Sequence, residues 1–503
     1  MLLATLVETS SAVASTRSRK AKVAALAELL RALDAPEVEP AVGFLTGAPR
    51  QGRIGVGWRT AHGVEVEAAT EPSIEVLELD AILSTLATTS GPGSVAARQA
   101  LLADLFGRAT PPEADFVRRL LTGELRQGAL AGVMTDAVAL AAEVPLEVVR
   151  RAAMLSGDLG RTAEAALSGG SEALESVRLA VLHPIGPMLA ASATDVADAL
   201  AKTGEASVEW KLDGARVQVH RQGTEVRIYT RNLNDITHRL PGVVDVALAM
   251  RGDAIVLDGE VLGVDEDAKP RAFQDTMSAF GRDDAVGAGD GLLVRFFDVL
   301  HRDGVDLIDE PLSVRHEHLD DLAGPLAVPR VRTADAEVAQ AALDDALAHG
   351  HEGVMVKAVG SPYDAGRRGG SWRKVKPVRT LDLVVLAAEW GHGRRQGWLS
   401  NLWLGARGAD GDFVMVGKTF KGLTDALLAW QTEALLEREV ARDGIVVHVR
   451  PELVVEIALD GVQASTRYPG GVALRFARVK GYRPDKDPVD ADLIETVQAM
   501  RLG

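Results

Sequence analysis

The sequence predicts a multidomain protein with an all-α N-terminal part, an α+β middle part and a C-terminal β-barrel. The chain has 503 residues, and one hydrophobic core rarely grows past about 250–300 residues, so several domains are expected. The pattern of the sequence also changes twice. Helical periodicity gives way to short β-rich runs near residue 207, and after about residue 382 strands dominate. We expect the three domains to span 1–180, 181–381 and 382–503.

Composition excludes several classes of protein. Hydrophobic residues make up 47% and charged residues 25%, as in an ordinary globular protein, and cysteine is absent. Without cysteine there is no disulfide framework, thiol nucleophile, cysteine-ligated zinc or iron–sulfur cluster. The net charge of −16 argues against a simple basic nucleic-acid coat protein. It does not exclude a nucleic-acid substrate, because binding depends on where the charge lies.

The first 15 residues superficially resemble a signal peptide. No basic residue precedes the apolar run and Glu8 interrupts it, so secretion is not expected. The sequence contains no run of about 18 apolar residues, so neither a spanning helix nor a membrane partner is expected. We expect a cytoplasmic monomer.

The N-terminal part predicts a helical bundle. Ser15 and Thr16 are plausible N-caps before an apolar stripe of helical period over residues 23–33. Turns are predicted at 43–47 and 52–57, where glycines cluster. Similar helical patterns recur at 95–106, 115–121, 131–142, 147–154 and 160–168.

The middle part alternates short strands with helices. Its helices are predicted at 240–250 and 334–349, and its strands at 208–211, 216–220, 226–230, 254–257, 293–297, 354–357 and 383–387. In the C-terminal part, strands at 402–406, 413–418 and 453–458 accompany one helix near 424–441. Short strands around a single helix are typical of a small β-barrel.

The most informative stretch is Lys211-Leu-Asp-Gly-Ala-Arg216, which follows a predicted strand. A lysine amine beside an Asp-Gly turn can attack phosphorus once it is neutral. Neighbouring cations, here Arg216, Lys374 and Lys376, together with partial burial, favour the neutral amine. In isolation, the tetrapeptide Lys211-Leu-Asp-Gly214 is more typical of a surface lysine before a β-turn.

With this stretch, the sequence resembles the ATP-dependent DNA ligases of the covalent nucleotidyltransferase superfamily. The resemblance covers essentially the whole chain, and its motifs occur in the family's order. The matching segments are 184–190, 211–216, 230–235, 257–260, 295–298, 352–357, 372–377 and 475–486.

The resemblance implies a role for each matched residue. Lys211 is the nucleophile that becomes lysyl-AMP, and the aromatic ring of Phe297 stacks on adenine. The nucleotide-binding residues would be Glu209, Arg216, Arg231, Glu260, Phe297, Arg368, Lys374 and Lys376. Glu260 and Glu352 would associate with Mg²⁺, which prefers oxygen ligands. Phosphate or DNA contacts would come from Arg475, Arg478 and Lys486.

The resemblance also implies the architecture and the partners. It implies a helical DNA-binding domain, a nucleotidyltransferase domain and an OB-fold barrel, with ATP and Mg²⁺ as cofactors and nicked duplex DNA as substrate. AMP would pass from Lys211 to the 5′-phosphate at a nick, and the 3′-hydroxyl would then displace it. The basic residues of the matching segment 475–486 lie on a separate domain from Lys211. We therefore expect the barrel to swing in for the first step and away afterwards.

Three basic islands stand out against the acidic total. Residues 17–22 hold four basic side chains, 367–379 hold six, and 475–486 hold five against one acid. Solvated loops often have this composition, but such islands also bind the phosphate backbone of DNA. We therefore expect salt-sensitive DNA binding by a protein of pI near 5.2.

Two apparent motifs are not expected to function. Val416-Gly-Lys418-Thr419 resembles the end of a P-loop, but Asp412 stands where that loop requires glycine. His349 and His351 flank a turn without partners at metal-binding spacing.

Three other functions remain open from the sequence. An RNA ligase or a capping guanylyltransferase shares the lysine chemistry, although the long helical first part favours a DNA ligase. A non-catalytic DNA clamp would not need the lysine and glutamates. An NAD⁺-dependent ligase is disfavoured because that family carries a four-cysteine zinc finger.

Overall fold

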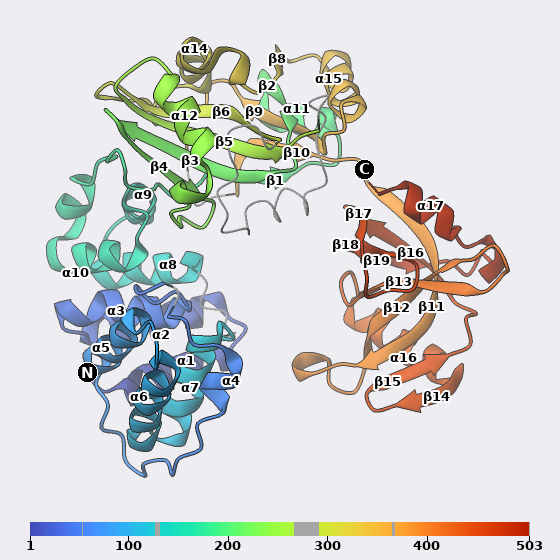
Figure 1. Cartoon of the computed structure of the whole chain (residues 1–503), viewed down its shortest axis with the longest axis horizontal. Coiled ribbons are helices and arrows are strands. Elements are labelled where there is room, and N and C mark those ends of the chain that lie inside the picture. The colour runs from blue at the N-terminus through green and yellow to red at the C-terminus, as the bar shows by residue number, and fades with distance from the viewer. Residues whose placement is uncertain (53, 126–130, 266–290, 365–367, 502–503) are drawn as a thin grey trace.

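A computed structural model describes residues 1–52, 54–125, 131–265, 291–364 and 368–501 (Figure 1). Helices form the N-terminal part, and two sheets with covering helices form the middle part. A mostly β C-terminal part follows. In Figure 1 the helical part and the C-terminal part lie on opposite sides of an open arrangement, and both adjoin the middle part. No helix in the described ranges is long and apolar enough to cross a membrane.

The all-α prediction for the N-terminal part is confirmed. Leu3 and Leu6, from the stretch that resembles a signal peptide, are fully buried in the helical core. The helices are α1 (Leu3–Ser15), α2 (Arg19–Ala32), α3 (Ala35–Thr46), α4 (Trp58–His62), α5 (Val76–Thr88), α6 (Ser94–Arg108), α7 (Pro111–Thr122), α8 (Ala131–Ala142), α9 (Leu146–Ser156) and α10 (Leu159–Glu175).

The turn predicted at 43–47 is wrong for most of its length. Gly43 lies inside α3, and Gly47, with φ of +73°, ends that helix in the left-handed conformation. A Cβ atom on Gly43 would lie 3.0 Å from the carbonyl oxygen of Ala48. Gly43 therefore allows the chain to fold back closely over the end of the helix.

The middle part contains two five-stranded sheets. The first has the order β1-β10-β9-β2-β8 and the second has the order β4-β3-β5-β6-β7. Their strands are β1 (Leu189–Ser192), β2 (Ala206–Lys211), β3 (Ala215–Gln222), β4 (Glu225–Thr230), β5 (Ala254–Gly263), β6 (Leu292–Arg302), β7 (Val305–Asp306), β8 (Arg330–Thr333), β9 (Gly353–Ala358) and β10 (Arg368–Val375). The short connection 212–214 passes directly from the first sheet to the second.

Helices cover one face of each sheet, which confirms the α+β prediction. Apolar residues of α11 (Val196–Thr203) and α15 (Ala336–Ala348) pack on the first sheet. Those of α12 (Pro241–Ala249) and α14 (Leu312–Ala323) pack on the second sheet. The remaining apolar side chains of both sheets meet in smaller shared clusters.

The C-terminal part is rich in β-structure. One seven-stranded sheet runs β13-β12-β11-β15-β14, with β16 and β19 joined through β11, and β17 pairs with β18. Its elements are β11 (Arg379–Trp390), β12 (Leu399–Arg407), β13 (Phe413–Thr419), α16 (Asp425–Leu436), β14 (Glu439–Asp443), β15 (Val446–Val449), β16 (Val454–Leu459), β17 (Gly461–Ala464), β18 (Val472–Arg475), β19 (Arg478–Tyr482) and α17 (Ile494–Ala499). Among the described residues these pairings do not close into a ring.

The helix predicted over 424–441 is too long. It ends at Leu436, and Glu439–Asp443 forms β14 against β15. Local helical propensity therefore yields to strand pairing at the edge of the sheet.

Candidate active site

Lys211 closes β2 at the point where the chain crosses between the two sheets. Side chains alternate along a strand, so Ser207, Glu209 and Lys211 share one face. Gly214 ends the crossing. A Cβ atom there would lie 2.3 Å from the carbonyl oxygen of Val261, so only glycine fits this approach. This crowding explains why an Asp-Gly pair follows the lysine.

Lys211 forms an ion pair with Glu352. The backbone N–H of Glu352 donates to the carbonyl oxygen of Lys211 at 3.0 Å, so the two residues are also joined through the main chain. Lys376 Nζ lies 2.6 Å from the second carboxylate oxygen of Glu352. Burial works to raise the pKa of Glu352, but the two ammonium groups outweigh it and hold the pKa below its usual range. The Lys211 side chain remains 20% exposed, which leaves it accessible to a substrate.

Glu260 is the second carboxylate beside this crossing. It stands opposite Arg216 in the β3–β5 ladder, and its Oε1 accepts a hydrogen bond of 3.0 Å from the N–H of Gly214. Burial raises the pKa of Glu260 to about 7, although the nearby Lys211 charge opposes this. Deprotonation near neutral pH makes Glu260 responsive to a further positive charge.

Glu260 and Glu352 form a small oxygen donor set. Among the described residues there is no group of three or more His, Asp or Glu side chains able to hold a metal ion. Mg²⁺ nonetheless commonly binds through one or two carboxylates, with phosphate oxygens and waters supplying the rest. The two glutamates therefore fit a cation that shares its ligands with a triphosphate.

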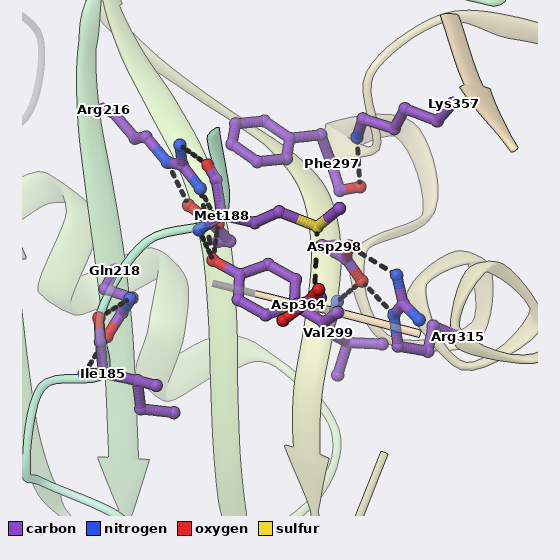
Figure 2. Close-up of polar contacts among 12 residues, drawn as sticks. Ile185, Met188, Arg216, Gln218, Phe297, Asp298, Val299, Arg315, Lys357 and Asp364 are labelled. Atoms are coloured by element: carbon purple, nitrogen blue, oxygen red, sulfur yellow. Dashed lines mark hydrogen bonds and ion pairs between the residues drawn. The ribbon is translucent and has the colours of Figure 1, made fainter. Parts of the chain in front are cut away.

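Arg216 is held by four internal contacts, most of them visible in Figure 2. Its Nε and Nη2 donate to Asp258 at 2.9 and 2.5 Å, and its Nη1 donates to the carbonyl oxygen of Met188 at 2.7 Å. Nη2 also lies 3.2 Å from the hydroxyl of Tyr363. Burial opposes the charge, but Asp258 outweighs it and raises the pKa of Arg216. The guanidinium is therefore fixed, 5.4 Å from the centre of the Phe297 ring.

Phe297 is partly exposed on β6 and backed by a buried lysine. Lys357 Nζ lies 4.6 Å from the ring centre of Phe297 and 4.2 Å from that of Trp372. It donates to the carbonyl oxygen of Phe297 at 3.2 Å (Figure 2). These contacts fix the ring that, by family resemblance, is expected to stack on adenine.

Glu209 lies behind this ring, not on the open surface. It is 1% exposed, and its carboxylate contacts Lys357 at 2.6 Å, Ser207 at 3.0 Å and His316 at 3.2 Å. Burial acts to raise its pKa, yet the Lys357 charge and His316 lower it to about 2. The carboxylate predicted to bind the nucleotide thus serves internal partners in this structure.

The remaining nucleotide-binding candidates belong to other segments of the chain than Lys211. Arg231 is exposed just after β4, and Lys374 is half-buried on β10 beside Met355 of β9. The side chain of Arg368 lies outside the described residues. Sequence reasoning missed Tyr363 and Asp258, both buried beside Arg216. Asp258 stands in the 257–260 motif, but nothing local indicates its partner.

The C-terminal part contacts the connection 212–214 and Lys376 through charged side chains. Arg475 Nη1 lies 3.2 Å from Asp213 Oδ2, and Lys376 lies 3.8 Å from Asp460. Arg478 contacts the same Asp460 at 3.4 Å. Lys486 instead pairs with Asp382 at 2.5 Å, at the start of β11. Of the three predicted C-terminal contacts, only Arg475 reaches the turn that follows Lys211, because Arg478 pairs with Asp460 and Lys486 with Asp382.

The two rejected motifs have structural explanations. Lys418 belongs to strand β13, where it contacts Glu389 and lies 3.9 Å from the ring centre of Trp403. His349 and His351 each pack on Trp210 with ring centres 4.8 Å apart. Burial lowers the pKa of His351 to about 4, so this ring is neutral at physiological pH.

Comparison with known proteins places these features in one family. Sequence profiles match at residues 59–139 (DNA ligase N terminus), 187–376 (ATP dependent DNA ligase domain) and 395–486 (ATP dependent DNA ligase C terminal region). A probable DNA ligase of Saccharopolyspora erythraea is 57% identical over 100% of this chain and 98% of its own. One from Rhodococcus opacus is 56% identical over 100% of both chains. The solved structure named Pmar-Lig_PreS3 has a TM-score of 0.63 at 19% identity, over 95% of this chain and 99% of that one, and shows the same fold.

Proposed function

The chain belongs to the ATP-dependent DNA ligases, and we propose that it seals nicks in duplex DNA through a lysyl-AMP intermediate on Lys211. One observation carries the assignment to this residue. The Lys211 amine is accessible at the crossing between two sheets, in contact with Glu352 and close to Glu260. Phe297 and Arg216 lie on the adjoining sheet, where a nucleotide could be held against them.

In the first step Lys211 Nζ attacks the α-phosphorus of ATP in line, and pyrophosphate leaves. The amine is protonated in its ion pair with Glu352 and must give up a proton before it attacks, and the Glu352 carboxylate, which touches it, is the group placed to accept that proton. Lys376 and Arg475 stand close enough to offset the negative charge that develops on phosphate oxygens. Lys374 joins them by family resemblance.

Glu260 and Glu352 are the residues that would hold Mg²⁺. When bound, the ion would neutralise charge on the phosphate oxygens. The pKa of Glu260, about 7, means that a nearby cation would favour its ionised form. Both carboxylates already stand within the charge field of Lys211.

The nucleotide base would lie against Phe297, with Lys357 and Trp372 fixing the ring from behind. Arg216, Arg231 and Arg368 are proposed as further nucleotide contacts on the basis of family resemblance. Glu209 would support the site from within, because its carboxylate is buried.

In the later steps AMP passes to the 5′-phosphate of the nick, and the 3′-hydroxyl displaces it. We propose that 382–503 is an OB-fold domain that docks through Arg475 and Asp460 for the first step and then rotates toward DNA, where Arg478 would contact phosphates. Lys486, paired with Asp382 in this structure, would become available after that rotation. The supporting observation is that the docking contacts are charged and few.

We propose further that the protein acts as a monomer. The helical domain (1–180) would encircle the duplex while 181–381 performs the chemistry. The basic islands at 17–22, 367–379 and 475–486 would bind backbone phosphates, so nick affinity should fall as salt rises. Nick affinity that is indifferent to salt would contradict this part of the proposal.

The test of the assignment is adduct formation. Lys211→Ala should abolish the mass increase of one AMP that the protein gains with ATP, because no other group occupies that position. Lys418→Ala is the matched control, since Lys418 lies on β13 and pairs with Glu389 of β11, and it should form the adduct normally. An adduct on the Lys211→Ala protein would overturn the assignment. Incubation with labelled ATP, GTP or NAD⁺ separates a ligase of this family from a capping enzyme or an NAD⁺-dependent ligase.

A further inference from the structure

Tyr363 carries a buried hydroxyl where three segments of the molecule meet. The residue is 1% exposed. Its hydroxyl donates to Asp258 Oδ2 at 2.8 Å and accepts from the N–H of Met188 at 3.0 Å. It also accepts from Arg216 Nη2 at 3.2 Å. The hydrogen-bonding capacity of one hydroxyl is therefore fully used by a carboxylate, a main-chain amide and a guanidinium.

One of these segments is the connection from the helical part to β1. The side-chain amide of Gln218, on β3, forms two hydrogen bonds with the main chain of this segment at Ile185 (Figure 2). It accepts from the N–H of Ile185 at 2.8 Å and donates to the carbonyl oxygen of Ile185 at 2.7 Å. Tyr229 of β4 donates to the carbonyl oxygen of Leu182. At Met188, Tyr363 holds the N–H and Arg216 holds the carbonyl oxygen. Arg216 is thus bonded directly to the connecting segment.

The ring of Tyr363 also faces the wall of the nucleotide site. It meets Trp372 edge-on with ring centres 5.8 Å apart, and Trp372 meets Phe297 edge-on at 6.3 Å. Burial and the neighbouring Asp258 raise the pKa of Tyr363 well above its ordinary value. The hydroxyl therefore stays protonated at any pH where the enzyme works.

We propose that Tyr363 is a positioning residue for self-adenylation: its hydroxyl fixes the orientation of Arg216, beside Phe297, and couples it to the segment that joins the helical domain. Asp258 alone leaves Arg216 a choice of rotations, because a carboxylate accepts from either edge of the guanidinium. The contact with Tyr363, together with the Met188 carbonyl oxygen, selects one of them. This inference rests on the proposed function of Lys211 and goes beyond it.

The experiment is Tyr363→Phe, which keeps the ring in the core and removes only the hydroxyl. The apparent KM for ATP in self-adenylation should rise by about tenfold with kcat nearly unchanged, as expected for losing one hydrogen bond to a charged group. Tyr229→Phe is the matched control. It removes another buried hydroxyl that bonds the same connecting segment, but one that does not touch Arg216. It should leave the KM for ATP unchanged.

A double-mutant cycle separates positioning from a merely structural effect. In an Arg216→Lys background, which loses the forked contacts, Tyr363→Phe should add less than twofold to the KM for ATP. Equal KM increases in Tyr363→Phe and Tyr229→Phe, or additive effects with Arg216→Lys, would overturn the proposal. Failure of wild-type protein to form an AMP adduct at all would instead refute the proposed function, so the two failures are distinguishable.

Discussion

The helical part and the C-terminal part are attached to the middle part in opposite ways. Met154 and Leu155 of α9 are buried in an apolar cluster with Ile185, Tyr363 and Trp372. The C-terminal part, in contrast, meets the middle part through ion pairs such as Arg475–Asp213. In the described part of the chain, its apolar clusters begin at Leu381 of β11 and include no residue that precedes β11. The peptide between β10 and β11 carries Val378, which is 58% exposed.

The difference shows which of the two attachments is permanent and which is reversible. Burying apolar surface contributes about 25 cal/mol per Å² and needs no charge to persist. The ion pairs of the C-terminal attachment are partly buried, with 18–31% of each side chain exposed, and separating the two parts returns these charges to water, so the pairs hold the parts together less firmly than a shared apolar core. One attachment therefore holds the helical part firmly against the middle part, and the other is the one that the proposed rotation would break.

The largest expected effect is on the apolar attachment. Leu155→Ala should lower the free energy of unfolding by about 2–5 kcal/mol, because it leaves a cavity in the shared cluster. Leu140→Ala, at a leucine of α8 that is 46% exposed, is the control and should change stability little. Denaturant unfolding followed by tryptophan fluorescence measures both. Equal stability of the two variants would mean that the helical part is not anchored through α9.

The next effect is on the charged attachment. Arg475→Ala should slow self-adenylation by about tenfold or more, as loss of a transition-state charge contact does, while changing stability by no more than about 1 kcal/mol. Arg442→Ala is the control, since Arg442 pairs with Glu439 and lies 5.9 Å from the ring centre of Trp390, both in the same part of the molecule. Single-turnover adduct formation with ATP is the measurement. A loss of stability as large as that of Leu155→Ala would erase the contrast between the attachments.

A third prediction concerns the middle part that both attachments share. The pKa of Glu260 is about 7 in the folded protein against an ordinary 4.5. As pH rises from about 4.5 to about 7, the unfolded chain loses this proton before the folded one does, so stability falls by on the order of 2 kcal/mol.

Glu260→Gln removes this titration. Without added metal, the variant should show a flatter dependence of stability on pH across that window, in thermal unfolding at a series of pH values. Asp245→Asn, at an aspartate of α12, is the control and should keep the wild-type slope. A wild-type slope in Glu260→Gln would contradict the assignment of the titration to this carboxylate.

The smallest effect is that of salt. Raising ionic strength from about 0.1 M to about 1 M shortens the screening length from about 10 Å to about 3 Å. The adenylation rate of the wild-type protein should fall by a few fold at saturating ATP, because the C-terminal contacts weaken. The Arg475→Ala protein should be less sensitive, since it has already lost one of them. Equal salt dependence would indicate that docking does not depend on these charges.

The local part of the fold could be predicted from the sequence. Helices α2, α6, α7, α8, α9 and α10 and the predicted strands occur where the periodicity indicated them. The errors fall where the next few residues decide the local structure. Gly43 lies in a helix that ends only at Gly47, and residues 439–441 form a strand because the chain turns back and β15 pairs with them.

The candidate site could be predicted only in outline. Resemblance to the family's motifs indicated Lys211, Glu260 and Glu352, which the structure brings together. It did not indicate that Glu209 is buried against Lys357, or that Lys486 pairs with Asp382. Those partners lie 148 and 104 residues apart along the chain, and no local pattern encodes such distances.

The sequence by itself determined the chemistry, because residue types and their order fix which nucleophile, carboxylates and cations are available. Through periodicity and propensity, it also determined the succession of a helical part, an α+β part and a β-rich part. The tertiary structure alone decided which charges neutralise one another and which are left for phosphate. It also decided that one end of the molecule is held by a shared apolar cluster and the other by a few ion pairs. Both depend on contacts across the sheets, where burial and partner geometry, not sequence distance, set the free energy.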